Sequence, residues 1–265
     1  MSIARILIIA GSDSGGGAGI QADVKAVTML GGHAMTAITA ITAQNTLGVQ
    51  GVHPVPTDMV VAQMESCIAD IGVDAVKIGM IGSAQTSLAV ADRLADIGVP
   101  VVVDPVMVAT SGSVLADAAT IAAFDRLMRV ATLVTPNAPE LVALTGIPVA
   151  DEDDLLSAGQ ALAARVGRDV LAKGGHVEGD AIRDSLIMPD GEAQHWTGRR
   201  IDTRHSHGTG CSLASAIATG LGQGMDARAS IGWARDYVRA ALLSAPGLGA
   251  GHGPMGAPRG FHAHA

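Results

Sequence analysis

The segment that decides the fold is Ile3-Ala-Arg-Ile-Leu-Ile-Ile-Ala10, followed by Gly11-Ser-Asp-Ser-Gly-Gly-Gly-Ala-Gly19. The first part is an almost continuous apolar run that ends at glycine, which is typical of a strand buried on both faces of a sheet. The second part is a glycine-rich loop, after which apolar residues recur at helical spacing from about Ala18 to Leu30. The segment therefore predicts a buried strand, a loop and a helix, which is the first repeat of an α/β fold.

The same alternation continues along the rest of the chain. We expect strands at 34–43, 49–55, 75–80, 99–105, 133–136 and 169–173, and helices at 57–71, 84–97, 117–129, 139–144, 151–166, 209–221 and 226–243. Two further strands, 181–188 and 193–197, are joined by a Pro-Asp-Gly turn and should be antiparallel. The pattern predicts a three-layer α/β/α fold with a mostly parallel central sheet and a few antiparallel strands. No linker-like stretch divides the chain, so we expect a single domain over 1–265 with an irregular tail at 246–265.

Composition narrows the functional classes. The chain has 265 residues, 48% hydrophobic but only 2% aromatic, so its core should be aliphatic. Few aromatic side chains and a net charge of −8 provide neither stacking platforms nor a basic stripe, which argues against nucleic-acid binding. No apolar run reaches the roughly 20 residues of a membrane helix. The N-terminal apolar run is too short for a signal peptide, and the two cysteines suggest no disulfide framework, so we expect a cytoplasmic protein.

A second glycine-rich stretch, His207-Gly-Thr-Gly-Cys-Ser212, opens an apolar helix. Gly208 and Gly210 admit backbone angles that other residues avoid and leave room for a ligand. The first N–H groups of the helix have no intrahelical partner, so they favour an anion, above all phosphate. The same groups should lower the pKa of Cys211. We therefore expect an anion site beside a polarised thiol, a combination suited to group transfer.

Polar residues stand at the ends of successive predicted strands, where open α/β sheets bind their ligands. They are Asp13, Gln44, Asn45, Lys77, Asp104, Asn137, Glu140 and Lys173. Any one of them alone has an ordinary structural explanation as a strand cap or a solvated end. The loop at Gly11–Gly19 lacks the glycine spacing of a dinucleotide fingerprint, and the pattern that ends in Gly-Lys-Ser/Thr is absent. A nucleotide would therefore bind in another way.

Several of these stretches form an ordered set over almost the whole chain. They are Ala10-Gly-Ser-Asp-Ser-Gly-Gly-Gly-Ala-Gly-Ile-Gln-Ala-Asp23, Ile41-Thr-Ala-Gln-Asn-Thr46, Val76-Lys-Ile-Gly-Met80, Val103-Asp-Pro-Val-Met107 with Ser111-Gly112, Thr135-Pro-Asn-Ala-Pro-Glu140, Lys173-Gly-Gly-His176 and His207-Gly-Thr-Gly-Cys211. Taken together, they resemble the ribokinase-like superfamily and, within it, the hydroxymethylpyrimidine/phosphomethylpyrimidine kinase family. One motif alone is weak, whereas the ordered set is specific.

The resemblance implies an ATP-dependent kinase with a ribokinase-like fold. Its substrate would be the hydroxymethyl group of 4-amino-5-hydroxymethyl-2-methylpyrimidine, and then the monophosphate, which would become the diphosphate in thiamine diphosphate biosynthesis. By the family's pattern Gln44 reads the amino group and a ring nitrogen through its paired acceptor and donor. Residues Gly11, Asp23, Met80 and Val106 would line the same pocket. The family also suggests Mg²⁺ and a homodimer.

For the phosphates, the resemblance implies a set of polar residues around the helix terminus. The ATP-binding residues would be Asp104, Asn137, Lys173 and Arg235, with Glu140 and Asp104 as magnesium ligands, and Gly208, Thr209, Gly210 and Cys211 as the catalytic group. Phosphoryl transfer depends mainly on positioning and charge stabilisation, which an oriented N–H cluster supplies. Cys211 would accept the hydroxymethyl proton, at a position where many sugar kinases of the superfamily carry aspartate. Arg235 replaces the lysine usual in the last helix, which keeps the charge and changes the geometry.

Two other readings remain open at this point. A pyridoxine or pyridoxal kinase would accept a similar hydroxymethyl-bearing aromatic ring. A non-catalytic pyrimidine-binding relative is a different class, but it would need none of the phosphate machinery at Asn137, Glu140, Lys173 and Gly208–Cys211.

Overall fold

The computed structural model describes residues 3–108, 112 and 115–258. Within them a sheet of nine strands has the order β3-β2-β1-β4-β5-β6-β7-β8-β9. The strands are β1 (Arg5–Asp13), β2 (His33–Asn45), β3 (Gly48–Pro54), β4 (Ala75–Ile78), β5 (Val101–Val103), β6 (Leu133–Val134), β7 (Asp169–Ala172), β8 (Ala181–Ile187) and β9 (Ala193–Arg199). The run from β2 to β7 is parallel, whereas β3, β8 and β9 pair antiparallel at the two edges. The expected mostly parallel sheet is confirmed.

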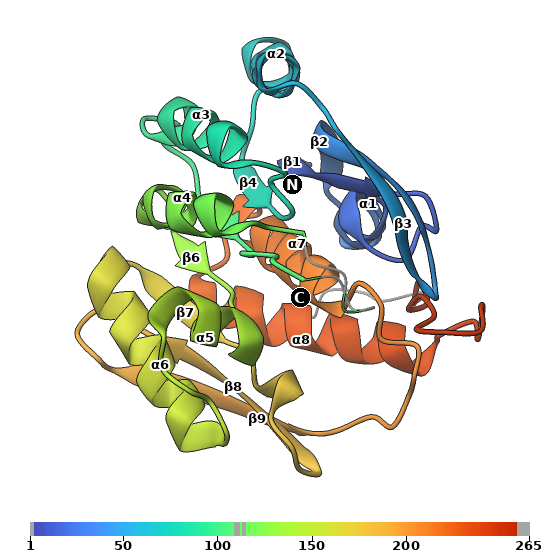
Figure 1. Cartoon of the computed structure of the whole chain (residues 1–265), viewed down its shortest axis with the longest axis vertical. Coiled ribbons are helices and arrows are strands. Elements are labelled where there is room, and N and C mark those ends of the chain that lie inside the picture. Colours follow the sequence, from blue (N-terminus) through green and yellow to red (C-terminus); the bar gives the residue numbers. More distant parts are fainter. Residues whose placement is uncertain (1–2, 109–111, 113–114, 259–265) are drawn as a thin grey trace.

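Helices cover both faces of the sheet (Figure 1). They are α1 (Gly19–Met29), α2 (Thr57–Asp70), α3 (Ala84–Leu94), α4 (Ala118–Arg129), α5 (Ala138–Thr145), α6 (Glu152–Val166), α7 (Thr209–Gly222) and α8 (Ala227–Leu243), with a short 3₁₀ turn η1 (Gly174–His176). The apolar faces of α1, α7 and α8 share one core with the sheet, and those of α2 to α6 share the other. The three-layer α/β/α arrangement is as expected.

Strand β1 shows why the sheet is buried on both sides. Leu7 and Ile9 belong to the core under α2 to α6, whereas Ile6 and Ile8 belong to the core under α1, α7 and α8. All four side chains are fully buried, because alternate residues of a strand point to opposite faces. Burial of such a side chain contributes roughly 1.5–3 kcal/mol. The apolar run at the N-terminus therefore fixes the centre of the molecule.

The binding crevice follows from the strand order. Strand β1 lies between β2 and β4, so the chain reverses its direction across the sheet at this point. Open α/β sheets bind ligands outside the carboxyl ends of the strands at such a reversal. The glycine-rich loop after β1 folds back over the strand end, where Ser12 and Gly19 form an isolated bridge. The loop therefore forms one wall of the crevice.

Element ends differ from the sequence expectations by a few residues, and the clearest difference is β6, which has only two residues. The tail at 246–258 contains no helix or strand, as expected, yet it packs closely. Thr46 accepts the N–H of His252 through its carbonyl at 2.9 Å, and His207 forms an isolated bridge with Pro254. Ser111 and the tail beyond residue 258 lie outside the described residues. No helix among the described residues has the length and apolarity needed to cross a membrane.

Candidate active site

A cavity of about 1420 Å³ opens outside the carboxyl ends of the parallel strands, where the strand order predicts it. Every predicted site residue except Asp23 lines it. These residues are Gly11, Gln44, Met80, Asp104, Val106, Asn137, Glu140, Lys173, Gly208, Thr209, Gly210, Cys211 and Arg235. The fold therefore gathers side chains from both ends of the sequence around one space.

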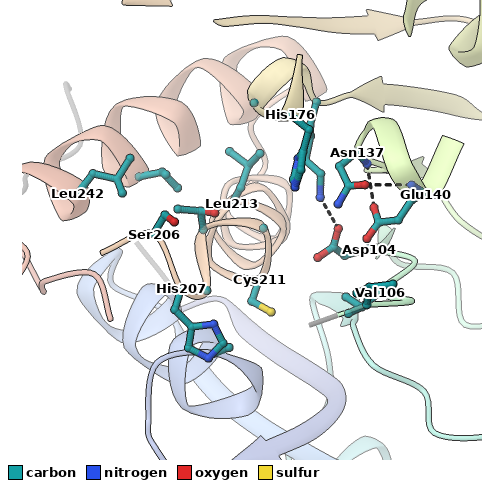
Figure 2. Close-up of a pocket in the computed structure, with 18 of the residues that line it drawn as sticks. Asp104, Val106, Asn137, Glu140, His176, Ser206, His207, Cys211, Leu213 and Leu242 are labelled. Carbon is teal, nitrogen blue, oxygen red and sulfur yellow. Dashed lines mark hydrogen bonds and ion pairs between the residues drawn. The ribbon is translucent and has the colours of Figure 1, made fainter. Parts of the chain in front are cut away.

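The N-terminus of α7 borders this cavity (Figure 2). Gly208 is its N-cap residue and has a left-handed φ of 86°. A Cβ at this position would overlap the carbonyl oxygen of Gly17 in the loop after β1. The position therefore requires glycine for its backbone angle and also for space. The two glycine-rich loops of the sequence meet here.

Within the described part of the chain, the first turn of α7 leaves two N–H groups for a ligand. The N–H of Thr209 donates to the carbonyl of Ser206 at 3.3 Å, whereas Ser212 N–H makes the first intrahelical bond, to Gly208. The N–H groups of Gly210 and Cys211 lie between them and precede any intrahelical acceptor. No acidic residue lies in this first turn. The helix terminus is therefore suited to an anion.

A buried ion pair lies beside that terminus. Lys173 Nζ donates to Asp104 Oδ1 at 2.6 Å, and Thr135 Oγ1 donates to the same oxygen at 3.0 Å. Asp104 is 2% and Lys173 is 9% exposed. A Cβ at Gly210 would lie 3.3 Å from Lys173 Nζ and 3.4 Å from Asp104 Oδ2, so the absence of a side chain keeps this junction open. The lysine and the helix terminus thus present positive charge to the same part of the cavity.

Asn137 and Glu140 begin α5 as a capping box (Figure 2). Asn137 Oδ1 accepts the N–H of Glu140 at 3.0 Å, and Glu140 Oε2 accepts the N–H of Asn137 at 2.8 Å. Burial raises the pKa of Glu140 to about 7, although the Lys173 ammonium acts in the opposite direction. The segment Asn137-Ala-Pro-Glu140 therefore stabilises the start of the helix, in addition to any contact with ligands.

The donor set fits Mg²⁺ bound together with phosphates. Asp104 and Glu140 are carboxylates on one cavity wall, and Mg²⁺ is commonly held by one or two carboxylates and by substrate phosphates. Within the described ranges, no cluster of three or more His, Cys, Asp or Glu side chains forms a metal cage. Phosphate oxygens and water would have to complete the coordination.

The expectation of a lowered pKa at Cys211 is wrong. Burial raises the pKa of the Cys211 thiol to about 11, although the Lys77 ammonium opposes this shift. The carboxylates of Asp23 and Asp104 add to the rise, and a backbone hydrogen bond from Gly19 reduces it. Desolvation and two nearby negative charges therefore outweigh the stabilisation of the thiolate by Lys77 and Gly19, and the thiol is protonated at neutral pH.

The expectation that Asp23 lines the pocket is also wrong. Asp23 is fully buried in α1, where both carboxylate oxygens accept hydrogen bonds from Lys77 Nζ, at 2.9 and 2.8 Å. Ser215 Oγ donates to Asp23 Oδ1 at 2.8 Å. Ser215 follows Cys211 by one helical turn and shares its side of α7, so the Asp23–Lys77 pair lies beneath Cys211 rather than in the cavity. Burial alone would lower the pKa of Lys77, but Asp23 raises it above the ordinary value.

Gln44, which is predicted to bind the pyrimidine ring, belongs to a hydrogen-bond network that the sequence does not predict. Gln44 Nε2 lies 3.0 Å from His207 Nε2, and the same imidazole nitrogen lies 3.2 Å from Asp13 Oδ2. Thr42 Oγ1 lies 3.3 Å from the other end of the Gln44 amide. His207 and Asp13 both stand in the motifs of the sequence, but no spacing rule connects residues 194 positions apart.

Arg235 lines the cavity from α8 and is held by Asp184. Its Nε donates to Asp184 Oδ2 at 2.9 Å, while Asp184 Oδ1 accepts the N–H of Gly174 at 2.9 Å. The arginine therefore uses its Nε for a structural contact that also fixes the turn after Lys173. A lysine at this position has a single side-chain nitrogen, so a contact with Asp184 would leave it no second nitrogen for a ligand.

A polyphosphate held against a helix N-terminus, with a pocket for a polar ring nearby, is what a kinase for small molecules requires. The fold and the site place the protein among the ribokinase-like kinases. More particularly, the chain belongs to the phosphomethylpyrimidine kinase family, whose model matches residues 13–256.

Three known proteins show the extent of the similarity. A hydroxymethylpyrimidine/phosphomethylpyrimidine kinase from Streptomyces coelicolor is 48% identical over 94% of this chain and 93% of that protein. A thiamine biosynthesis bifunctional protein from Geobacter sulfurreducens is also 48% identical, over 94% of this chain and 51% of the longer relative. The solved structure of a pyridoxal kinase from Staphylococcus aureus in complex with AMP-PCP and pyridoxal has a TM-score of 0.88 and 27% identity, and the match covers 97% of this chain and 94% of that one.

Proposed function

We propose that the protein transfers the γ-phosphoryl group of ATP to the hydroxymethyl oxygen of 4-amino-5-hydroxymethyl-2-methylpyrimidine. In a second turnover it would phosphorylate the monophosphate, giving the diphosphate used in thiamine diphosphate biosynthesis. Each step forms one P–O bond, breaks the bond between the β- and γ-phosphates of ATP and releases ADP. The observation that supports this proposal best is that Gln44 and the α7 terminus line one cavity in a member of this family.

The pyrimidine would lie between the wall of β1 and the residues after β4 and β5. Gly11 and Met80 are in close contact there, because a Cβ on Gly11 would overlap the Met80 methyl group. Val106 lines the same cavity. A flat ring against these apolar surfaces leaves its polar edge to Gln44, whose amide offers one acceptor and two donors.

The phosphates would occupy the opposite part of the cavity. The N–H groups of Gly210 and Cys211 and the Lys173 ammonium would stabilise the charge that develops on the transferred group. Asn137 and Arg235 would contact the rest of the nucleotide. Asp104 and Glu140 would hold Mg²⁺, which neutralises phosphate charge when bound. Closely held charges of this kind need little reorganisation during the reaction.

Cys211 is the side chain proposed to face the hydroxymethyl oxygen. Its raised pKa means that the resting thiol must lose its own proton before it can accept one from the substrate. Phosphoryl transfer through a loose transition state needs only late proton removal, so a small population of thiolate next to Lys77 suffices. We expect Cys211→Ala to lower kcat strongly with a modest change in pyrimidine KM, whereas unchanged turnover would exclude the base role.

A pyridoxine or pyridoxal kinase is the second candidate function, and the S. aureus neighbour is the observation in its favour. A coupled ADP-release assay with hydroxymethylpyrimidine, its monophosphate, pyridoxine and pyridoxal separates the two. The proposal expects the highest kcat/KM with the pyrimidine and ADP release with its monophosphate. Higher kcat/KM with the pyridine vitamers, or ADP release with none of the four despite binding, would overturn it.

The proposal also covers the state of the protein in the cell. We take 1–265 to be a single kinase domain that acts in the cytoplasm as a homodimer. Ile41 and Val52 are 53% and 49% exposed on the hairpin of β2 and β3, and apolar side chains at a sheet edge favour association. Sedimentation equilibrium tests the dimer.

A further inference from the structure

A half-turn of the Gln44 amide about its last side-chain bond exchanges the positions of its oxygen and its NH₂ group. The surrounding hydrogen bonds determine which of the two faces which neighbour. One end is 3.0 Å from His207 Nε2, and the other is 3.3 Å from Thr42 Oγ1. His207 is 6% and Thr42 is 5% exposed, so water does not compete strongly with either contact. The orientation of the amide therefore depends on whether His207 and Thr42 each require a hydrogen-bond donor or an acceptor.

Asp13 determines which end of the Gln44 amide faces the His207 imidazole. Its carboxylate accepts the N–H groups of Gly15, Gly17 and Ala18 at 2.8 to 2.9 Å. Burial opposes ionisation of Asp13, but the hydrogen bonds from His207 and the loop outweigh it and lower its pKa. An ionised Asp13 Oδ2 at 3.2 Å from His207 Nε2 requires a hydrogen on that nitrogen. A nitrogen that carries a hydrogen presents no lone pair to the Gln44 NH₂ group, so the end of the amide that faces it must be the oxygen, and the single Nε2 hydrogen is shared between that oxygen and Asp13 Oδ2.

Thr42 leads to the same assignment independently. Its hydroxyl has one hydrogen, which it donates to the Ser12 carbonyl at 2.9 Å. It can then only accept from the Gln44 amide, so the end that faces Thr42 must be the NH₂ group. Both neighbours therefore require the Gln44 oxygen toward His207 and the NH₂ group toward Thr42. This orientation is related by a half-turn to the one in which Nε2 faces His207.

We propose that His207, held by Asp13, is the positioning residue that turns the Gln44 carbonyl toward the imidazole and the NH₂ group toward Thr42, and thereby sets the ring selectivity of the enzyme. Figure 2 shows His207 in the loop that leads to Cys211, so the residue before the anion site also arranges the ring site. The tail supports His207 from behind, because the His207 N–H donates to the Gly253 carbonyl at 3.2 Å.

The consequence for the substrate rests on the proposed function. An aminopyrimidine edge offers an amino donor next to a ring-nitrogen acceptor, and an amide fixed in one orientation pairs with that edge in one register. A pyridine vitamer lacks this adjacent pair, so it gains nothing from the fixed amide. Loss of His207 should therefore weaken pyrimidine binding more than it weakens binding of pyridoxine or ATP.

The test measures kcat and KM of the full-length protein for hydroxymethylpyrimidine, pyridoxine and ATP. His207→Ala should raise the pyrimidine KM by about tenfold or more, because a hydrogen-bonded orientation is lost, and leave the ATP KM within about twofold. His207→Gln places an amide N–H near the position of the imidazole Nε2 and should restore the pyrimidine KM to within about threefold. On the other side, Thr42→Ser keeps the acceptor and should match the wild type, while Thr42→Val should raise the pyrimidine KM.

Each outcome bears on the proposal. An unchanged pyrimidine KM in His207→Ala would overturn it. Equal losses for the pyrimidine, pyridoxine and ATP, without rescue by His207→Gln, would show that His207 only supports the loop, which also overturns it. A wild-type protein that does not phosphorylate the pyrimidine would refute the proposed function itself, and the present proposal with it. An active wild type with an unaltered His207→Ala variant refutes the present proposal alone.

Discussion

At the scale of single residues, Cys211 shows a competition between a helix terminus and burial. The first turn of α7 favours a thiolate, and so does Lys77, yet burial and the carboxylates of Asp23 and Asp104 raise the pKa to about 11. A sequence motif reveals the helix terminus and hides the carboxylates, which come from other segments. The wrong sign of the predicted shift has this cause.

The raised pKa predicts a slow and steeply pH-dependent thiol. Because only the thiolate reacts, alkylation of Cys211 by iodoacetamide should accelerate about tenfold per pH unit from pH 7 to 9, without a plateau. The Cys67→Ser variant leaves Cys211 as the single cysteine of the chain, so mass spectrometry of that variant measures the rate. The Cys67→Ser/Cys211→Ser protein is the blank. A plateau below pH 8 would show that the helix terminus prevails after all.

The buried Asp23–Lys77 pair predicts an asymmetric cost of substitution. Lys77→Met leaves a buried carboxylate without its partner and should lower the free energy of unfolding by about 3–5 kcal/mol. The double variant Lys77→Met/Asp23→Leu removes both charges and should lie within about 2 kcal/mol of the wild type, as urea unfolding would show. The exposed pair of Arg126 and Asp92 is the matched control, and Arg126→Met should cost less than about 1 kcal/mol. A Lys77→Met cost as small as the control would contradict the prediction.

At the scale of elements, the sequence predicts much of the fold because hydrophobic periodicity is local. The apolar run in β1 and the spaced apolar residues of α7 and α8 can be recognised from short windows of sequence. Every helix expected is present in the described chain. Sheet order and the two-residue β6 depend on contacts between distant segments, which no window of sequence contains. The same limit explains the site. Most of the residues predicted at strand ends line the cavity. Lys77, also predicted at a strand end, instead lies buried inside β4 and pairs with Asp23, which the family resemblance places in the pocket.

Helix α5 allows the cap and the metal site to be separated. Glu140→Gln keeps a side-chain oxygen for the N–H of Asn137, so the capping box should survive and stability should change little. Glu140→Ala removes that acceptor and should cost about 1 kcal/mol of unfolding free energy. Both variants lose a carboxylate, so both should need more Mg²⁺ for half-maximal ADP release. If Glu140→Gln has the wild-type Mg²⁺ dependence, Glu140 is a cap residue and not a ligand.

At the scale of the whole molecule, the tail at 246–258 contacts both the β2–β3 hairpin that carries Gln44 and the loop that carries His207. Its N–H groups at Gly251 and His252 donate to Thr46, in the turn between β2 and β3, while the Gly253 carbonyl accepts the N–H of His207 before the anion site. Figure 1 shows this red segment beside the end of the β2–β3 hairpin. Composition suggests only an irregular glycine-rich end, since the contacts of a glycine cannot be read from its own identity.

The tail should therefore belong to the cooperative unit of the fold. A Cβ at Gly251 would overlap the Thr46 carbonyl oxygen, so Gly251→Ala should lower the free energy of unfolding by about 1–3 kcal/mol through overpacking. Leu248 is 60% exposed in the same segment, and Leu248→Ala should change it by less than about 0.5 kcal/mol. Urea unfolding followed by far-UV circular dichroism measures both. Equal effects would mean that the segment frays independently; a loss confined to Gly251→Ala means that the sheet edge carrying Gln44 and the loop carrying Cys211 are stabilised together by residues that follow the last helix.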